Sequence, residues 1–216
     1  TSPLPVPAGS QADVEIINNS TEPFLVTGVL DGGLVKSSGS GNTIVSNPVG
    51  NVLIDNSGGG TVTVTGLIPG GVVTAIGSGM TVVNQPAGNV RIDNVGTGTT
   101  TVIGAVAGST VTITGSGTTN LVDPAGRITV ANNGSGISQV DNAPGGTVVI
   151  ASGSGATVIN APLGNVTLDN SGTGTATVIA VPAGSTVATT GSGATVISAP
   201  AGNVTLDNTG TGTATI

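Results

Sequence analysis

The stretch that decides the fold is residues 191–216, GSGATVISAPAGNVTLDNTGTGTATI. It holds two Gly-X-Gly tripeptides, Gly191–Gly193 and Gly210–Gly212, whose first glycines are 19 residues apart. Between them, aliphatic and polar residues alternate, as in Thr205-Leu206-Asp207. This period of two is typical of a strand with one buried face. One unit is therefore predicted to contain two strands and two turns.

The same unit recurs along nearly the whole chain without an insertion or deletion. The Gly-X-Gly tripeptides begin at Gly39, Gly58, Gly77, Gly96, Gly115, Gly134, Gly153, Gly172, Gly191 and Gly210. Four residues before each first glycine the residue is always aliphatic: Val35, Ile54, Val73, Ile92, Val111, Val130, Val149, Leu168, Val187 and Leu206. Four residues after each second glycine it is again aliphatic: Val45, Val64, Val83, Val102, Leu121, Val140, Ile159, Val178, Ile197 and Ile216. Stacked coils need such columns, because each coil buries its inward residues against its neighbours.

The second turn of the unit alternates between two forms, so the complete repeat is 38 residues long. One form carries Pro-x-Gly, as in Pro124-Ala125-Gly126, and the other places a lone glycine such as Gly108. We expect the glycines of all these turns to supply positive φ angles. The sequence predicts an all-β fold, a single-chain β-solenoid of about eleven 19-residue coils with parallel, in-register stacking. An antiparallel sandwich is the rival fold, but its hairpin loops would tolerate the length changes that these repeats lack.

The predicted domain organisation is a Pro-rich leader at residues 1–12 and a solenoid at residues 13–216. Within the solenoid, residues 13–38 form a divergent N-terminal region and residues 39–216 the regular repeats. Phe24, the single aromatic residue, is expected to help cap the first coil. The last core residues, Ile197 and Ile216, are candidates for assembly, because an open solenoid end is a template for strand addition. Either the repeat array continues beyond this end, or one subunit stacks on another.

Composition excludes several functions. The 216 residues include 38 Gly, three Lys or Arg, ten Asp or Glu, no His and no Cys, for a formal net charge of −7. Nucleic-acid binding needs clustered basic residues or stacking aromatics, so no nucleic-acid partner is expected. No apolar run approaches the ~18 residues of a membrane helix, so no membrane insertion is expected.

No cofactor, metal or catalytic site is expected either. Asp55, Asp93, Asp169 and Asp207 are predicted to point outward, about 9.5 Å apart in alternate coils. Calcium needs six to eight oxygens at about 2.4 Å, which this spacing does not supply. The only local charge cluster is Arg91 with Asp93, and without a nearby nucleophile or base it offers little chemistry. The sequence predicts that the chain is not an enzyme.

Two regular polar series remain as candidate sites. One is a series of asparagines placed just before every second Gly-X-Gly: Asn56, Asn94, Asn132, Asn170 and Asn208. The alternation along the strand points these side chains inward, where their amides can satisfy buried backbone groups of the turn. The other is a series of outward Thr-x-Thr pairs, a candidate assembly surface: Thr61 and Thr63, Thr99 and Thr101, Thr175 and Thr177, Thr213 and Thr215. The intervening coils place Ala, Val, Met or Asn at most of these positions.

By this periodicity, residues 13–216 resemble extracellular β-solenoid repeat proteins as a broad class: microbial surface filaments, adhesin stalks, sheath proteins and solenoid ice-binding proteins. The resemblance implies an extracellular or cell-surface location. We expect a structural subunit of an extracellular filament, sheath or surface fibre, with further copies of itself as partner, assembling by end-to-end and lateral packing. The alternatives are an ice-binding solenoid, whose partner is an ice surface, and a stalk fragment of a larger adhesin.

Overall fold

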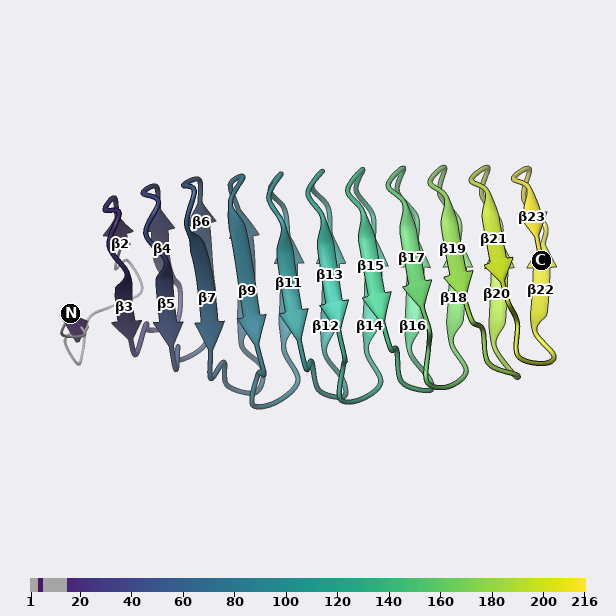
Figure 1. Cartoon of the computed structure of the whole chain (residues 1–216), viewed down its shortest axis with the longest axis horizontal. Coiled ribbons are helices and arrows are strands. Elements are labelled where there is room, and N and C mark those ends of the chain that lie inside the picture. Colours follow the sequence, from purple (N-terminus) through teal and green to yellow (C-terminus); the bar gives the residue numbers. More distant parts are fainter. Residues whose placement is uncertain (1–3, 6–14) are drawn as a thin grey trace.

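A computed structural model describes residues 4–5 and 15–216 of the chain, and these residues form a parallel β-solenoid (Figure 1). Each coil contributes one strand to each of two sheets, and every strand pairs in parallel with the equivalent strand of the next coil. The predicted fold class is confirmed, and the parallel pairing excludes the antiparallel sandwich. Each coil has two strands, as the alternating pattern predicted.

The two sheets, here called sheet A and sheet B, run the length of the solenoid. Sheet A consists of β1 (Leu4–Pro5), β3 (Phe24–Thr27), β5 (Thr43–Ser46), β7 (Thr61–Thr65), β9 (Met80–Asn84), β11 (Thr100–Ile103), β13 (Thr119–Val122), β15 (Ser138–Asp141), β17 (Thr157–Asn160), β19 (Ala176–Ile179), β21 (Thr195–Ser198) and β23 (Ala214–Thr215). Sheet B consists of β2 (Glu15–Asn18), β4 (Gly33–Ser37), β6 (Val52–Asn56), β8 (Val72–Ile76), β10 (Arg91–Asn94), β12 (Thr110–Ile113), β14 (Thr129–Asn132), β16 (Val148–Ala151), β18 (Thr167–Asn170), β20 (Thr186–Thr189) and β22 (Thr205–Asn208).

Of the predicted leader, residues 1–3 and 6–12 lie outside the described residues. Leu4 and Pro5 form β1, which pairs with β3. The predicted boundaries after residues 12 and 38 stay predictions.

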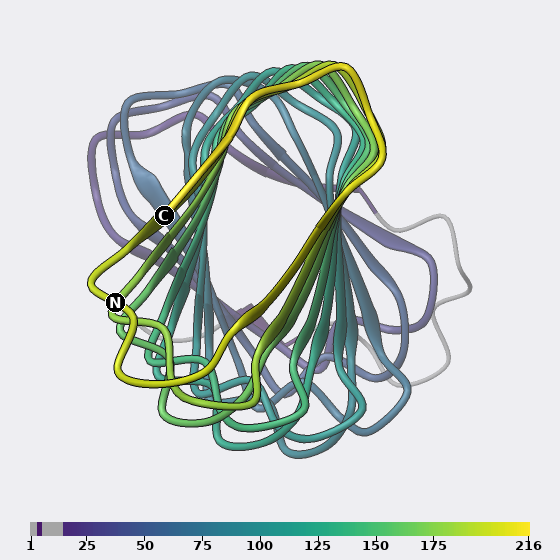
Figure 2. The same ribbon diagram turned by 90° about the vertical axis from the view of Figure 1, so that its right-hand side faces the viewer.

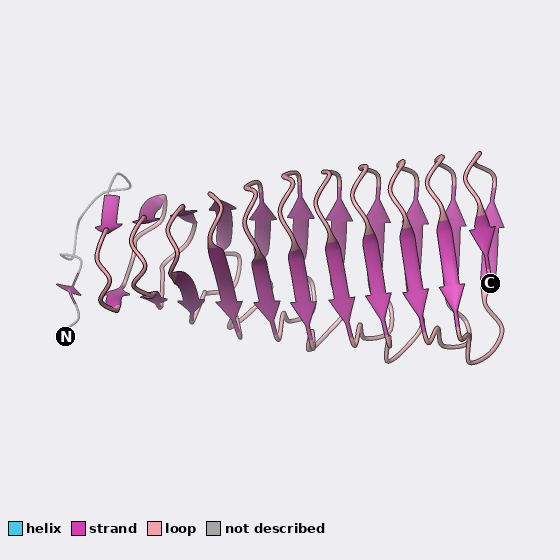
Figure 3. Cartoon of the chain, turned by 45° about the horizontal axis from the view of Figure 1, so that its top comes forward, coloured by secondary structure: helices cyan, strands magenta, loops and turns pink. Residues whose placement is uncertain are grey.

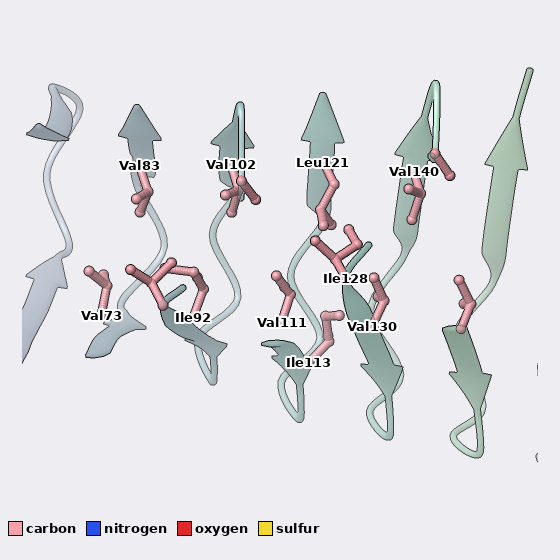
Figure 4. Close-up of a cluster of buried hydrophobic side chains, with 14 of the residues drawn as sticks. Val73, Val83, Ile92, Val102, Val111, Ile113, Leu121, Ile128, Val130 and Val140 are labelled. Carbon is pink, nitrogen blue, oxygen red and sulfur yellow. The ribbon is translucent and has the colours of Figure 1, made fainter. Parts of the chain in front are cut away.

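The core lies between the two sheets, and both aliphatic columns point into it as predicted. Val83, Val102 and Leu121 come from sheet A and face Ile92 and Val111 of sheet B across the interior (Figure 4). All five are fully buried or nearly so. Viewed along the solenoid axis, the coils overlie one another with a gradual rotation (Figure 2), which is the twist expected of stacked strands. Figure 3 shows the two rows of strands joined by loops along both edges.

The Gly-X-Gly glycines are required for close approach between coils rather than for positive φ, so that part of our expectation was wrong. Among the ten tripeptides only Gly77 has a left-handed φ, of 90°. The N–H of Gly136 donates to the carbonyl of Gly115 in the preceding coil at 3.1 Å. A Cβ on Gly136 would lie far inside van der Waals contact with the carbonyl oxygen of Gly117. Coils stacked at a single strand spacing leave no room for a side chain here.

The lone glycines of the second turn do have left-handed φ as expected, for example 83° at Gly108. A further left-handed column lies at the residue that follows each sheet-A strand. This position has φ between 45° and 68° in ten successive coils. Its residues are Gly28, Asn47, Gly66, Gln85, Gly104, Asp123, Asn142, Ala161, Ala180 and Ala199. The sequence did not reveal this column, because glycine occupies only three of the ten positions.

The alternation of the second turn has a hydrogen-bonding basis. In one pair of turns the Gly70 N–H donates to the Asn89 carbonyl at 2.7 Å, and the Ala87 N–H donates back to the Leu67 carbonyl at 2.9 Å. The next pair repeats this pattern between Gly108 and Arg127. The turns are therefore linked two by two, which makes a pair of coils the repeating unit at this edge.

Among the strands β2 to β23, one pair departs from the 19-residue register. Between β6 and β8, Ile54 pairs with Ala75 and Val52 pairs with Val73, whereas the sequence columns predicted that Ile54 stacks on Val73. The neighbouring sheet-A pair, β7 with β9, keeps the regular offset, with Thr61 opposite Met80. A shift of two residues keeps every side chain on its face. Both registers therefore satisfy the same inward and outward pattern, and the pattern alone does not distinguish them.

Gly136→Ala should lower the free energy of unfolding by about 2 kcal/mol, because the added methyl group is forced against the backbone of the preceding coil. Urea denaturation followed by far-ultraviolet circular dichroism measures this, since the chain has no Trp or Tyr. The matched control is Ser135→Ala, an exposed residue of the same turn, which should change stability by less than about 0.5 kcal/mol. Equal effects of the two variants would contradict the close-approach constraint.

Ala180→Gly should stabilise the solenoid by about 0.5–1 kcal/mol. Ala180 has φ of 58°, a conformation that costs an alanine about 1–2 kcal/mol, and this gain exceeds the entropy lost by introducing glycine. Ala183→Gly, in the same turn but without a left-handed φ, should be mildly destabilising. A lower thermal midpoint for Ala180→Gly than for the parent chain would show that the backbone at this position is not strained.

Candidate functional surfaces

The buried asparagines form a polar seam along the Gly-X-Gly edge. Asn56, Asn94, Asn132 and Asn170 are each at most 1 % exposed, whereas Asn208 in the last coil is exposed. The Asn132 Nδ2 group donates to the Gly136 carbonyl at 3.1 Å, within its own turn. It also donates to the next coil, at the Ala156 carbonyl (3.2 Å) and Thr157 Oγ1 (3.1 Å).

This geometry is the one expected of side chains that satisfy buried turn backbone. The predicted inward direction of the series is observed in the four buried members. The seam joins each coil that carries an asparagine to the coil after it.

Sequence reasoning missed two parts of this seam. Asn18 belongs to it, because its Nδ2 donates to Thr43 Oγ1 at 2.9 Å. The buried hydroxyl partners were also missed, although they recur every 38 residues: Thr43, Thr81, Thr119, Thr157 and Thr195. Of these, Thr81 is buried in the equivalent place, but Asn56 donates to the Met80 carbonyl instead, at 2.6 Å. The 38-residue spacing of inward threonines is the signal that could have identified them.

The Thr-x-Thr pairs lie on the outer face of sheet A. Thr63 stacks between Ile44 and Val82, and Thr101 stacks between Val82 and Asn120. Thr63 and Thr101 are therefore separated by about 9.6 Å, two strand spacings. Thr101 and Thr177 are four coils apart, because Gln139 occupies the equivalent position between them. Aliphatic or amide side chains lie between the threonines. The outer face of sheet A is a mixed Thr and aliphatic surface rather than a continuous threonine array.

Charge is distributed very unequally between the two outer faces. Among the described strands, those of sheet A carry one charged residue, Asp141. Its carboxylate accepts hydrogen bonds from Gln139 Nε2 at 3.0 Å and from Asn160 Nδ2 at 3.2 Å. The strands of sheet B carry seven charged residues: Glu15, Lys36, Asp55, Arg91, Asp93, Asp169 and Asp207. Five acidic and two basic residues give the outer face of sheet B a net charge of −3.

The outer face of sheet A also exposes large apolar side chains. Ile44, Met80, Ile137 and Ile179 are between 37 % and 47 % exposed. They are distributed along the sheet from β5 to β19, so that the apolar character is not confined to one patch. A surface of this length that carries one charged residue and is partly apolar is suited to packing against another protein surface.

The only ion pair in the described residues lies on sheet B. Arg91 Nε donates to Asp93 at 3.0 Å, and this hydrogen bond and the charge of Asp93 raise the pKa of Arg91. Within residues 15–216 there is no pocket and no group of three or more His, Cys, Asp or Glu residues able to hold a metal ion. No helix of the described chain is long and apolar enough to cross a membrane.

The candidate end residues differ in their surroundings. Phe24, on β3, is half-buried and packs against the hydrophobic core. Ile197 is 2 % exposed and belongs to that core, so its replacement would report on folding before assembly. Ile216, in the last coil, is 65 % exposed. A further coil would cover Ile216, whether it came from a continuation of the chain or from a second copy.

Comparison of the chain with protein-family models, with curated proteins and with solved structures gives no match. The fold is therefore established by the strand pairing alone. The case for function depends on the chain's own surfaces.

Asn132→Ala should destabilise the solenoid by about 2–3 kcal/mol, because it leaves the Gly136 carbonyl and the Thr157 hydroxyl buried without their donor, whereas the Ala156 carbonyl keeps the hydrogen bond from the Ser138 N–H. Asn208→Ala, at the exposed end of the series, should cost less than about 1 kcal/mol. Chemical denaturation measures both.

The double variant Asn132→Ala/Thr157→Ala should recover part of the loss, because the orphaned hydroxyl is removed as well. The intervening coils already place Ala151 and Ala176 at these two positions, both buried. Similar costs for Asn132→Ala and Asn208→Ala would contradict the bridging role.

Proposed function

We propose that the chain is a structural subunit of an extracellular filament, sheath or surface fibre. The observation that carries this proposal is the uniformity of the rod. Two parallel sheets continue from the first described coil to the last, and the interior is filled by small aliphatic, Thr and Asn side chains. In such a solenoid each coil contacts only its neighbours, so that length is gained by adding coils without changing the fold.

The surfaces support the same proposal. The outer faces are regular along the rod, and the described residues contain no concave site at which a small ligand would bind. β22 and β23 continue the parallel ladders of the rod through their pairing with β20 and β21. A copy of the chain stacked on this coil would extend both ladders without a change of fold. The proposed partner is a further copy of the chain, and the proposed location is extracellular or at the cell surface.

An ice-binding solenoid is the second candidate, because Thr101 and Thr177 are among outward threonines that recur along the outer face of sheet A. The interruption of these threonines by Val and Asn weakens this candidate. A stalk within a larger adhesin is the third, and it requires the same rod physics.

Negative-stain electron microscopy across a concentration series tests the first proposal. We expect filaments that are one solenoid wide or a small multiple of that width, and that lengthen with concentration. Ile216→Asp should shorten them, because a charge would be placed in the end contact, whereas Thr211→Asp, in the exposed turn of the same coil, should not. Isolated rods of about 50 Å at every concentration would contradict the filament proposal.

Thermal hysteresis of the same sample separates the second candidate from the first. An ice-binding solenoid would show activity as an isolated rod and lose it in Thr101→Tyr/Thr177→Tyr without unfolding. Absence of thermal hysteresis would exclude this candidate.

A further inference from the structure

We propose that the outer face of sheet A binds the same face of a second copy, so that rods pair face to face in twos. This inference deepens the proposed function by assigning the lateral partner, and it is tested independently of end-to-end growth. The surface in question, here called the pairing face, consists of the outward side chains of β5 to β23.

The size of the pairing face matches that of a stable interface. About ten strands at ~4.8 Å, each about 13 Å long, present roughly 600 Å². Standard protein interfaces bury about 800 Å² per partner, with a scatter of about 200 Å². The pairing face therefore reaches the range of a specific dimer only if most of its length is used. Because the coils rotate gradually along the rod (Figure 2), this requires that the two rods wind around each other.

The chemistry of the pairing face suits a second β-sheet. Its aliphatic and threonine side chains stand on a pleated surface, as do those that interdigitate between the sheets of a β-sandwich. The large side chains of Ile44, Met80, Ile137 and Ile179 are spread along it and would be covered on pairing. Asp141 is its single charged residue, and Gln139 and Asn160 already donate hydrogen bonds to that carboxylate.

The opposite face limits the assembly to two rods. The outer face of sheet B has a net charge of −3 from the seven residues named above. Two such faces would repel each other, and desolvating their carboxylates would be costly. A face that binds its own counterpart closes on itself when two copies meet. The inference therefore predicts paired rods and excludes broad sheets formed by repeated lateral addition.

Sedimentation and light scattering at micromolar concentration test this with the whole chain. Two copies of the 20.2 kDa chain have a mass of 40.4 kDa, and we expect this mass at concentrations that are too low for filaments. Thr101→Lys/Thr177→Lys should restore the monomer mass, because like charges would face each other across the interface. We expect the dissociation constant to rise by about a hundredfold or more.

The matched control is Thr112→Lys/Ala188→Lys. It adds the same charges to the equivalent, similarly exposed outward positions of sheet B, on β12 and β20, and it should leave the pair intact. A circular dichroism melt of each variant confirms that it is folded.

A 20.2 kDa species for the parent chain up to about millimolar concentration would overturn the inference, as would equal dissociation by both double variants. Single-width filaments would sustain the proposed function and reject the pairing. Stable pairs that never lengthen into filaments would support the pairing and contradict the proposed function. Monomers with thermal hysteresis that Thr101→Lys/Thr177→Lys abolishes would assign the pairing face to ice instead and reject the dimer.

Discussion

The structure depends on one constraint: consecutive coils are separated by a single strand spacing of about 4.8 Å. Every position of the repeat therefore becomes a column in which each side chain contacts its counterparts above and below. Such columns favour residues that stack on themselves, which explains the Val, Ile, Thr and Asn composition. At the tightest point of the coil, the preceding carbonyl leaves no room for a Cβ. Gly117 and Gly136 are glycine there because of the spacing, not because of the backbone angle.

The 38-residue period arises at both edges of the rod, by different interactions. Along the Gly-X-Gly edge, a buried asparagine such as Asn132 reaches into the next coil and hydrogen-bonds Thr157. The buried Oδ1 atoms of Asn56, Asn132 and Asn170 have no donor, so part of the gain from the Nδ2 hydrogen bonds is offset. Along the other edge, turns exchange backbone hydrogen bonds in pairs. Both interactions join two coils, and they make the coil pair the structural unit of a chain whose backbone repeats every coil.

Because side chains fill the interior of the rod, we expect any binding to take place on its outer surfaces. The two outer faces have similar backbone geometry but opposite character, because the charged side chains are concentrated on sheet B. Alternation along each strand places charge and apolar side chains on different sides of a sheet. The difference between the two sheets, however, is a property of the particular residues in each half of the repeat. The rod therefore has one outer face with seven charged residues and one with a single charged residue.

The sequence by itself determined the coil length, the two aliphatic columns, the inward asparagines and the solenoid class. Few other folds are compatible with an uninterrupted 19-residue period of alternating apolar and polar residues. The sequence did not determine the two-residue shift between β6 and β8 or the left-handed column that ends in Ala161, Ala180 and Ala199. Periodicity specifies which side of a strand each residue faces, and registers that differ by two residues share that pattern. Only the tertiary structure decides between them, since the choice depends on how the turns close and on which backbone groups meet across coils.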